Sequence, residues 1–215
     1  MLDNFMFFID FDGTISSQDF CAAMVMKYAG DGWEELNRLW EKKLISTEEC
    51  ARRTLELIDA DPEELEAFFK TVTIDPTFQT FISWADSNDF PIYVLSDGYD
   101  NYIKEAFALN GISLPYYANH MEFEEGWKIN CSYSDSECQL CGVCKTGLIK
   151  RLAKTGYRIV YIGDGYSDIC PAEYSDMVFA KNDLARLCQD KTIPYFQYKD
   201  FGDVIRIMEK AGFLK

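Results

Sequence analysis

The chain has 215 residues, 48% of them hydrophobic, and a formal net charge of −15 at pH 7. This length and composition indicate a globular protein with a full core, organised as one α/β domain with an insertion or as two small domains. The negative charge repels nucleic acid and anionic membranes, so neither is an expected partner.

The first predicted element is a buried strand, Phe5–Ile9, which runs into two carboxylates, Asp10 and Asp12, and a turn at Gly13. Carboxylates at this spacing can hold a hard cation such as Mg²⁺ and still offer one oxygen as a nucleophile. The segment therefore indicates phosphoryl-transfer chemistry; the alternative is an acidic turn without a chemical role. The apolar run is too short for a signal peptide or a membrane span, so we expect a cytoplasmic protein.

Residues 17–88 carry helix signals almost without interruption. Ser46 and Glu49 have the spacing of a capping box, and Asp61 precedes a proline at the first helical position. Residues 16–74 predict a small helical bundle inserted between the first strand and the second.

The second predicted strand, residues 91–98, delivers Ser96 near its end. The Ser96 hydroxyl and the backbone N–H groups that follow it can bind phosphate oxygens. Beyond this strand, residues 99–109 predict a helix, and residues 116–130 predict a hairpin that turns near Gly126.

Four cysteines crowd the segment before the next predicted helix: Cys131, Cys138, Cys141 and Cys144. Their thiolates could bind Zn²⁺ tetrahedrally and so fix this loop. Two alternatives stay open. One is unligated thiols or a disulfide, and the other is an iron–sulfur cluster, although the further cysteine typical of such clusters does not follow.

Lys145 begins the next predicted helix, where its ammonium could neutralise phosphoryl charge. A third strand, within residues 158–168, ends in Asp164 and Asp168. The alternation of strands and helices continues to the C-terminus and predicts a doubly wound parallel sheet with helices on both faces. Because ligands bind outside the carboxyl ends of such strands, we expect the polar residues at those ends to form one site.

These motifs, in this order, resemble the haloacid dehalogenase superfamily of phosphatases over nearly all of the chain. The matching motifs are Asp10-Phe-Asp-Gly-Thr14, Ser96, Lys145 and Gly163-Asp-Gly-Tyr-Ser-Asp168. Within the superfamily, the chain is most similar to the phosphoserine-phosphatase-like group. The resemblance implies a Rossmann-like α/β catalytic core formed by residues 1–15 and 75–215. It also implies that residues 16–74 form a helical cap domain that closes over the site.

The resemblance assigns roles to the acidic residues. Asp10 is expected to attack phosphorus and form an aspartyl-phosphate, and Asp12 to protonate the leaving alcohol and later take a proton from water. Asp10, the backbone carbonyl of Asp12 and the side chain of Asp164 are expected to hold Mg²⁺. Asp168 is expected to be a further ligand or to support one.

The phosphoryl oxygens are expected to bind Ser96, Lys145 and the backbone N–H groups of Asp97 and Gly98. Asp97 departs from the small residue expected beside the serine. We therefore expect its side chain to point away from the phosphate.

The residues at the entry to the cap are expected to select the substrate, because relatives of this type contact the leaving group of the substrate there. Asp19 and Phe20 occupy this entry, although a helix cap and a core aromatic residue are the alternative. Two branches of the group share a cysteine-rich stretch before the lysine. They are the methionine-salvage enol-phosphate phosphatases and the phosphocholine/phosphoethanolamine phosphatases.

We therefore expect a Mg²⁺-dependent phosphomonoesterase that acts on a small cytosolic metabolite, as a monomer or a homodimer. The leading candidate substrate is 2-hydroxy-3-keto-5-methylthiopentenyl-1-phosphate. Phosphocholine, phosphoethanolamine and phosphoserine are the alternatives. Two other classes of function are a phosphomutase, which passes the phosphoryl group to another hydroxyl, and a non-catalytic binding protein built around the cysteines.

Overall fold

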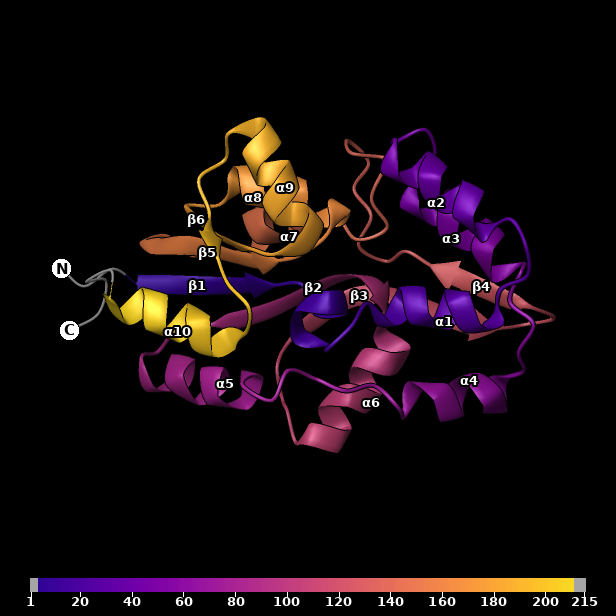
Figure 1. Ribbon diagram of the computed structural model, residues 1–215, viewed down its shortest axis with the longest axis horizontal. Coiled ribbons are helices and arrows are strands. Elements are labelled where there is room, and N and C mark those ends of the chain that lie inside the picture. The colour runs from indigo at the N-terminus through magenta and orange to yellow at the C-terminus, as the bar shows by residue number, and fades with distance from the viewer. Residues whose placement is uncertain (1–3, 211–215) are drawn as a thin grey trace.

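The computed structural model of the protein describes residues 4–210. Within these residues, strands form one seven-stranded sheet in the order β4-β3-β2-β1-β5-β6-β7 (Figure 1). The strands are β1 (Asn4–Ile9), β2 (Ile92–Tyr99), β3 (Tyr116–Phe123), β4 (Trp127–Asn130), β5 (Tyr157–Gly163), β6 (Met177–Ala180) and β7 (Phe196–Gln197). Neighbouring strands pair in parallel, except that β3 and β4 are antiparallel. The parallel sheet and the hairpin predicted from the sequence are both confirmed.

Strand β1 lies near the centre of the sheet because both of its faces are apolar. Phe5, Phe7 and Ile9 belong to one core cluster, whereas Met6 and Phe8 belong to the other. Side chains alternate across a strand, so the two clusters lie on opposite faces of the sheet.

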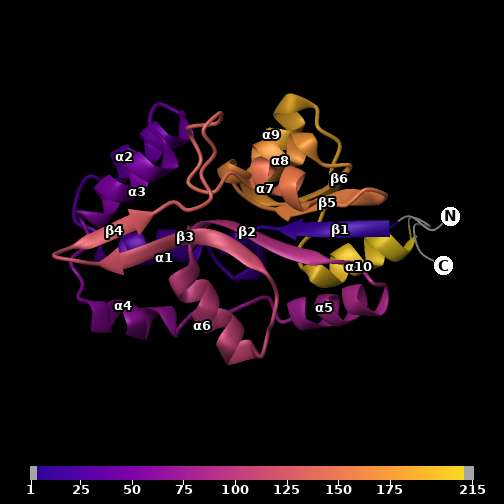
Figure 2. The same ribbon diagram turned by 180° about the vertical axis from the view of Figure 1, so that it is seen from behind.

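Helices cover both faces of the sheet (Figures 1 and 2). The face of Phe7 is covered by α5 (Phe78–Ser87), α6 (Asp100–Asn110) and α10 (Phe201–Lys210). The face of Phe8 is covered by α7 (Lys145–Leu152), α8 (Ile169–Tyr174) and α9 (Asn182–Lys191). This confirms the doubly wound α/β fold.

Helices α1 (Phe20–Tyr28), α2 (Trp33–Glu41), α3 (Thr47–Leu55) and α4 (Pro62–Phe69) lie between β1 and β2 in the chain. Their N-terminal caps follow the sequence signals. The Ser46 side chain accepts a hydrogen bond from Glu49 N–H, and Asp61 and Glu64 form a complete capping box. These helices gather beside the β3–β4 hairpin, away from β6 (Figure 1).

The inserted helices contact the sheet at its β3–β4 end. Helix α3 packs against β4, and the Trp127 indole N–H donates a hydrogen bond to the Ala60 carbonyl at 2.8 Å. The division into a core and a closing cap stays a prediction, and residues 1–3 and 211–215 of the predicted core segments lie outside the described residues.

The turns follow the backbone preferences that the sequence indicated. Helix α6 ends at Gly111, which has a φ of 63°, a left-handed conformation that glycine adopts without strain. The β3–β4 turn uses positive φ values at Glu125 and Gly126. Across residues 4–210, no helix is both long and apolar enough to cross a bilayer.

The centre of the sheet provides a test of the core. Phe7 is fully buried, and its ring contacts the rings of Phe81, Trp84 and Phe90. We expect Phe7→Ala to lower the free energy of unfolding by about 3–5 kcal/mol, because it leaves a cavity that these rings cannot fill. Urea denaturation followed by circular dichroism measures the change.

Leu109→Ala on α6 is the matched control for Phe7→Ala, because Leu109 is 60% exposed. This control is expected to change the stability by less than about 0.5 kcal/mol. Equal losses in the two variants would contradict the assignment of Phe7 to the core.

Candidate active site

The carboxyl ends of β1, β2 and β5 bring the predicted site residues together. Asp10 directly follows β1, and its N–H donates to the Ile162 carbonyl on β5 at 2.9 Å. The chain then turns through Gly13, whose φ is 71°. A Cβ at Gly13 would lie 2.5 Å from Asp164 Oδ2, so glycine is required there for space as well as for conformation.

Lys145 is the buried cation of the site and lies at the start of α7, as predicted. Its Nζ donates to Asp10 Oδ1 at 2.6 Å, to Asp168 Oδ1 at 2.6 Å and to Ser167 Oγ at 3.0 Å. Burial lowers the pKa of Lys145, but Asp10 and Asp168 outweigh it and hold this pKa well above its ordinary value. The ammonium therefore stays charged, with all three protons donated.

Asp168 is fully buried and is satisfied by hydrogen bonds from several directions. Its Oδ1 accepts from Lys145 and from the Tyr161 hydroxyl, and its Oδ2 accepts from the backbone N–H groups of Asp164 and Gly165. The carboxylate thus fixes both the lysine and the loop that carries Asp164.

Among residues 4–210, one group of potential metal ligands has ligand atoms within 4.8 Å of one another: Asp10, Asp164 and Asp168. Burial and the neighbouring carboxylates raise the pKa of Asp10 well above its ordinary value, and burial with Asp168 raises the pKa of Asp164 to about 6. Clustered carboxylate oxygens are the donors that a hard divalent cation prefers, and such a cation would relieve their repulsion. The group therefore fits Mg²⁺.

Asp12 is held by hydrogen bonds from three elements. Its Oδ1 accepts from the N–H groups of Phe20 and Cys21 at the start of α1, at 3.1 and 3.2 Å. Its Oδ2 accepts from Ser96 Oγ at 3.2 Å and from the Tyr102 hydroxyl at 2.6 Å. Burial and the nearby Asp19 outweigh these bonds and raise the pKa of Asp12 to about 7.

Tyr102 was missed by the sequence reasoning. It is fully buried on the inner face of α6, where its ring contacts Phe11 and Phe20. In the sequence it is one aromatic residue in an amphipathic helix. That pattern does not separate a core ring from a ring whose hydroxyl reaches a carboxylate. Tyr161, which donates to Asp168, was missed because it is one aromatic residue in a buried strand, where a core ring is equally expected.

Ser96 and Gly98 lie beside Asp12 at the end of β2. Gly98 N–H donates to Ser96 Oγ at 2.9 Å, while the serine donates to Asp12. A Cβ on Gly98 would lie 1.8 Å from the Tyr102 hydroxyl and 2.3 Å from Asp12 Oδ2. Only glycine leaves room for the contact between the tyrosine and the carboxylate.

The Asp97 side chain connects neighbouring segments. Its Oδ1 accepts from Val143 N–H at 2.8 Å, and its Oδ2 accepts from Thr47 Oγ1 at 3.3 Å. Burial raises the pKa of this carboxyl. Asp97 thus joins β2 to the segment before Lys145 and to the start of α3.

Asp19 and Phe20 lie at the entry to the inserted helices. The Asp19 side chain caps α1 by accepting from Ala22 N–H at 2.8 Å. The Phe20 ring is buried and stacks on Phe68, with centroids 4.6 Å apart, while the Phe20 backbone contacts Asp12. Contact of either residue with a substrate stays a prediction.

The zinc site predicted at Cys131, Cys138, Cys141 and Cys144 is not supported. Within residues 4–210, no three of these thiols converge closely enough to hold one ion. Cys138 and Cys141 approach each other, with Sγ atoms 3.4 Å apart. The spacing of cysteines in a sequence does not fix the directions of their side chains, and here the loop brings together a pair instead of a tetrahedral set.

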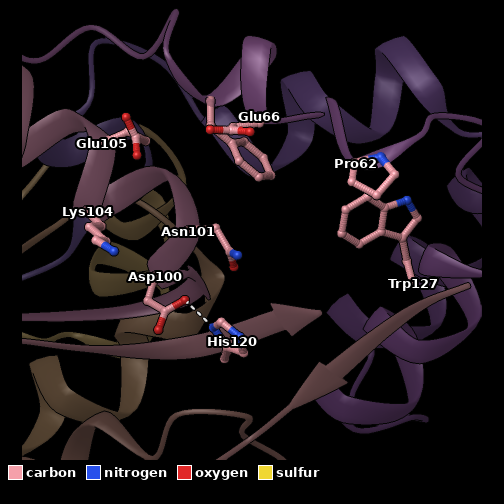
Figure 3. Close-up of a pocket in the computed structure, with 9 residues that line it drawn as sticks. Pro62, Glu66, Asp100, Asn101, Lys104, Glu105, His120 and Trp127 are labelled. Carbon is pink, nitrogen blue, oxygen red and sulfur yellow. Dashed lines mark hydrogen bonds and ion pairs between the residues drawn. The ribbon is translucent and has the colours of Figure 1, made fainter. Parts of the chain in front are cut away.

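A separate cleft of about 320 Å³ lies between α4, α6 and the β3–β4 hairpin (Figure 3). It contains a hydrogen bond between His120 Nδ1 and Asp100 Oδ1, with a distance of 2.8 Å, and is bordered by Trp127 and Phe69. The predicted site residues do not line this cleft.

Comparison with known proteins identifies the family. A family model for haloacid dehalogenase-like hydrolases matches residues 7–173. The chain therefore belongs to the haloacid dehalogenase-like hydrolase family, as the sequence motifs predicted.

Relatives and solved structures extend over most of the chain. A protein from Brevibacillus brevis named 2-hydroxy-3-keto-5-methylthiopentenyl-1-phosphate phosphatase is 30% identical over 98% of each chain. A protein of the same name from Bacillus velezensis is 31% identical over 94% of this chain and 89% of its own. A phosphoserine phosphatase structure holding an analogue of the phospho-aspartyl intermediate aligns with a TM-score of 0.70, over 95% of this chain and 98% of its own. Its identity of 18% establishes the fold alone.

Gly98→Ala tests the packing around Asp12. The added methyl group must displace Tyr102 or Asp12, so we expect kcat/KM for an aryl phosphate to fall by about 100-fold, as for other misplacements near 1 Å. Gly165→Ala is the matched control, because a Cβ there meets nothing within 4 Å. Similar activity in the two variants would contradict the proposed crowding.

Proposed function

We propose that this protein is a Mg²⁺-dependent phosphomonoesterase that hydrolyses 2-hydroxy-3-keto-5-methylthiopentenyl-1-phosphate through an aspartyl-phosphate. The reaction class is supported by family membership, and the substrate by full-length relatives of that name. The observation that carries the mechanism is the pairing of two carboxylates with different surroundings: Asp10 beside Lys145, and Asp12 beside Ser96 and Tyr102.

Asp10 is the proposed nucleophile. It lies at the strand end with one oxygen bound to Lys145, and the other oxygen is left to attack phosphorus. The bond between phosphorus and the leaving oxygen breaks as the bond to the carboxylate oxygen forms. Water then attacks phosphorus, the bond between phosphorus and the Asp10 oxygen breaks, and inorganic phosphate leaves as the Asp10 carboxylate is regenerated.

Asp12 is the proposed general acid and base. Four hydrogen-bond donors fix its orientation, two from the backbone of α1 and two from Ser96 and Tyr102. It would give a proton to the leaving alcohol and take one from the attacking water. One carboxylate cannot attack phosphorus and transfer the proton in the same step, which is why the site needs both aspartates.

The remaining groups stabilise charge. Lys145 is held in place by Asp168 and Ser167, so its ammonium is already oriented when phosphoryl charge develops. Ser96 and the backbone N–H groups of Asp97 and Gly98 are the proposed phosphate ligands at the end of β2.

Asp10, Asp164 and Asp168 are the side chains proposed to hold or support Mg²⁺, with the Asp12 carbonyl. The ion would neutralise phosphoryl oxygens and hold the phosphate against Asp10. A cytoplasmic location and a monomeric or homodimeric state stay predictions from the sequence.

Asp10→Asn tests the nucleophile. The change keeps the side-chain volume but removes the attacking oxygen, so we expect phosphate release from an aryl phosphate with Mg²⁺ to fall by about 10⁴-fold or more. Asp183→Asn on α9, at an exposed carboxylate, is the matched control and should keep wild-type activity. Retention of more than about a tenth of the wild-type rate by Asp10→Asn would rule out this mechanism.

A substrate panel tests the specificity. We expect kcat/KM for 2-hydroxy-3-keto-5-methylthiopentenyl-1-phosphate to exceed that for phosphocholine, phosphoethanolamine and phosphoserine by at least about 100-fold. The readout is inorganic phosphate, with NMR of the products to detect any phosphorylated isomer. A higher kcat/KM for another ester would overturn the proposed substrate but not the reaction class. A phosphorylated isomer among the products would identify a phosphomutase.

A further inference from the structure

The cysteine loop, defined as residues 131–144, contains a pair of thiols poised for bond formation. The Sγ atoms of Cys138 and Cys141 are 3.4 Å apart, whereas a disulfide has a length of about 2.05 Å. Both side chains are partly exposed, so a small oxidant can reach them. Closing the remaining gap requires only a small shift of the loop.

A local turn holds the first of these thiols in place. The Asp135 side chain accepts hydrogen bonds from the N–H groups of Glu137 and Cys138 at 2.8 and 3.2 Å. The Asp135 carbonyl accepts from Gln139 N–H at 3.0 Å. The turn therefore fixes the position from which Cys138 faces Cys141.

The two thiols have different surroundings. Burial alone would raise the pKa of Cys138, but hydrogen bonds from the backbone of Leu140 and from Cys141 outweigh it and lower this pKa. Burial and the nearby Asp97 raise the pKa of Cys141. This asymmetry favours Cys138 as the thiol that reacts first, because the thiolate is the nucleophile.

We propose that Cys138 and Cys141 form a reversible redox pair that is oxidised to a disulfide by hydrogen peroxide and that controls the phosphatase. The Cys138 thiolate attacks the peroxide, the O–O bond breaks, and a sulfenic acid and water form. The Cys141 sulfur then attacks the Cys138 sulfur, and the S–O bond breaks to release a second water. In total, two thiols are oxidised and one peroxide is reduced to two waters; a dithiol reverses the reaction by exchange.

The position of the pair connects its oxidation state to the active site. The Leu140 carbonyl, between the two cysteines in the chain, accepts from Thr47 N–H at the start of α3 at 2.8 Å. Val143 N–H donates to Asp97, and Lys145 follows two residues later. A disulfide that pulls Cys141 toward Cys138 therefore shifts the Leu140 carbonyl that binds the start of α3. It also shifts the backbone between Cys141 and Lys145, and with it the position of the lysine.

The test starts from fully reduced protein, freed of reductant and treated with equimolar hydrogen peroxide. We expect an intact mass lower by two hydrogens and a peptide that links Cys138 to Cys141. We also expect kcat for an aryl phosphate to fall by about tenfold, since displacements near 1 Å at such a site cost up to ~100-fold. Dithiothreitol should restore both the mass and kcat. The mass measurement does not depend on catalysis, so failure of the pair is distinguishable from failure of the proposed function.

Serine variants separate the pair from the other thiols. Cys138→Ser and Cys141→Ser should each lose the disulfide and keep kcat after peroxide treatment, whereas Cys170→Ser, at an exposed cysteine outside the loop, should respond like wild type. Cys144 also interacts with Cys138, so Cys144→Ser is included and should still form the disulfide. A link from Cys138 to Cys144, oxidation without any disulfide, or a disulfide that leaves kcat unchanged would each overturn the proposal.

Discussion

The buried ammonium of Lys145 is the interaction on which the site depends. It lies between Asp10 at the end of β1 and Asp168 after β5, and each Nζ–Oδ1 distance is 2.6 Å. Without this cation, the two carboxylates would be buried side by side with no positive charge to compensate them. Leaving buried charges uncompensated in this way costs several kcal/mol. The lysine therefore lets adjacent parallel strands end in acidic residues at the same edge of the sheet.

This arrangement also explains the order of the elements around the site. Strand β1 lies between β2 and β5, so the residues after these strands can reach Asp10 and Asp12 from both sides. The start of α7 approaches the same edge and delivers Lys145. A cation at a helix N-terminus opposes the helix dipole, and here the neighbouring carboxylates more than compensate for that cost.

The parallel sheet and most of the residues of the site could be predicted from the sequence, because the signals for them are local. A strongly apolar strand followed by Asp10 and Asp12, and another followed by Asp164, specify both the sheet and the edge at which its polar residues gather. The partners of those residues could not be predicted. Tyr102 and Tyr161 act through hydroxyl groups at the far ends of core rings, and their positions depend on the packing of α6 and β5. The directions of the side chains also decide whether the cysteines of the loop can share an ion, which is why four closely spaced cysteines do not converge on a zinc site.

Asp12 takes two of its hydrogen bonds from the first turn of α1, which belongs to the inserted helices and not to the sheet. The acid strength of this carboxyl is therefore set partly by a segment that lies outside the α/β core. Protein engineers who exchange the inserted helices between relatives to change the accepted ester would at the same time change the proton affinity of Asp12. Grafts that begin after Cys21 would keep this contact, and grafts that begin at Ser16 would replace it.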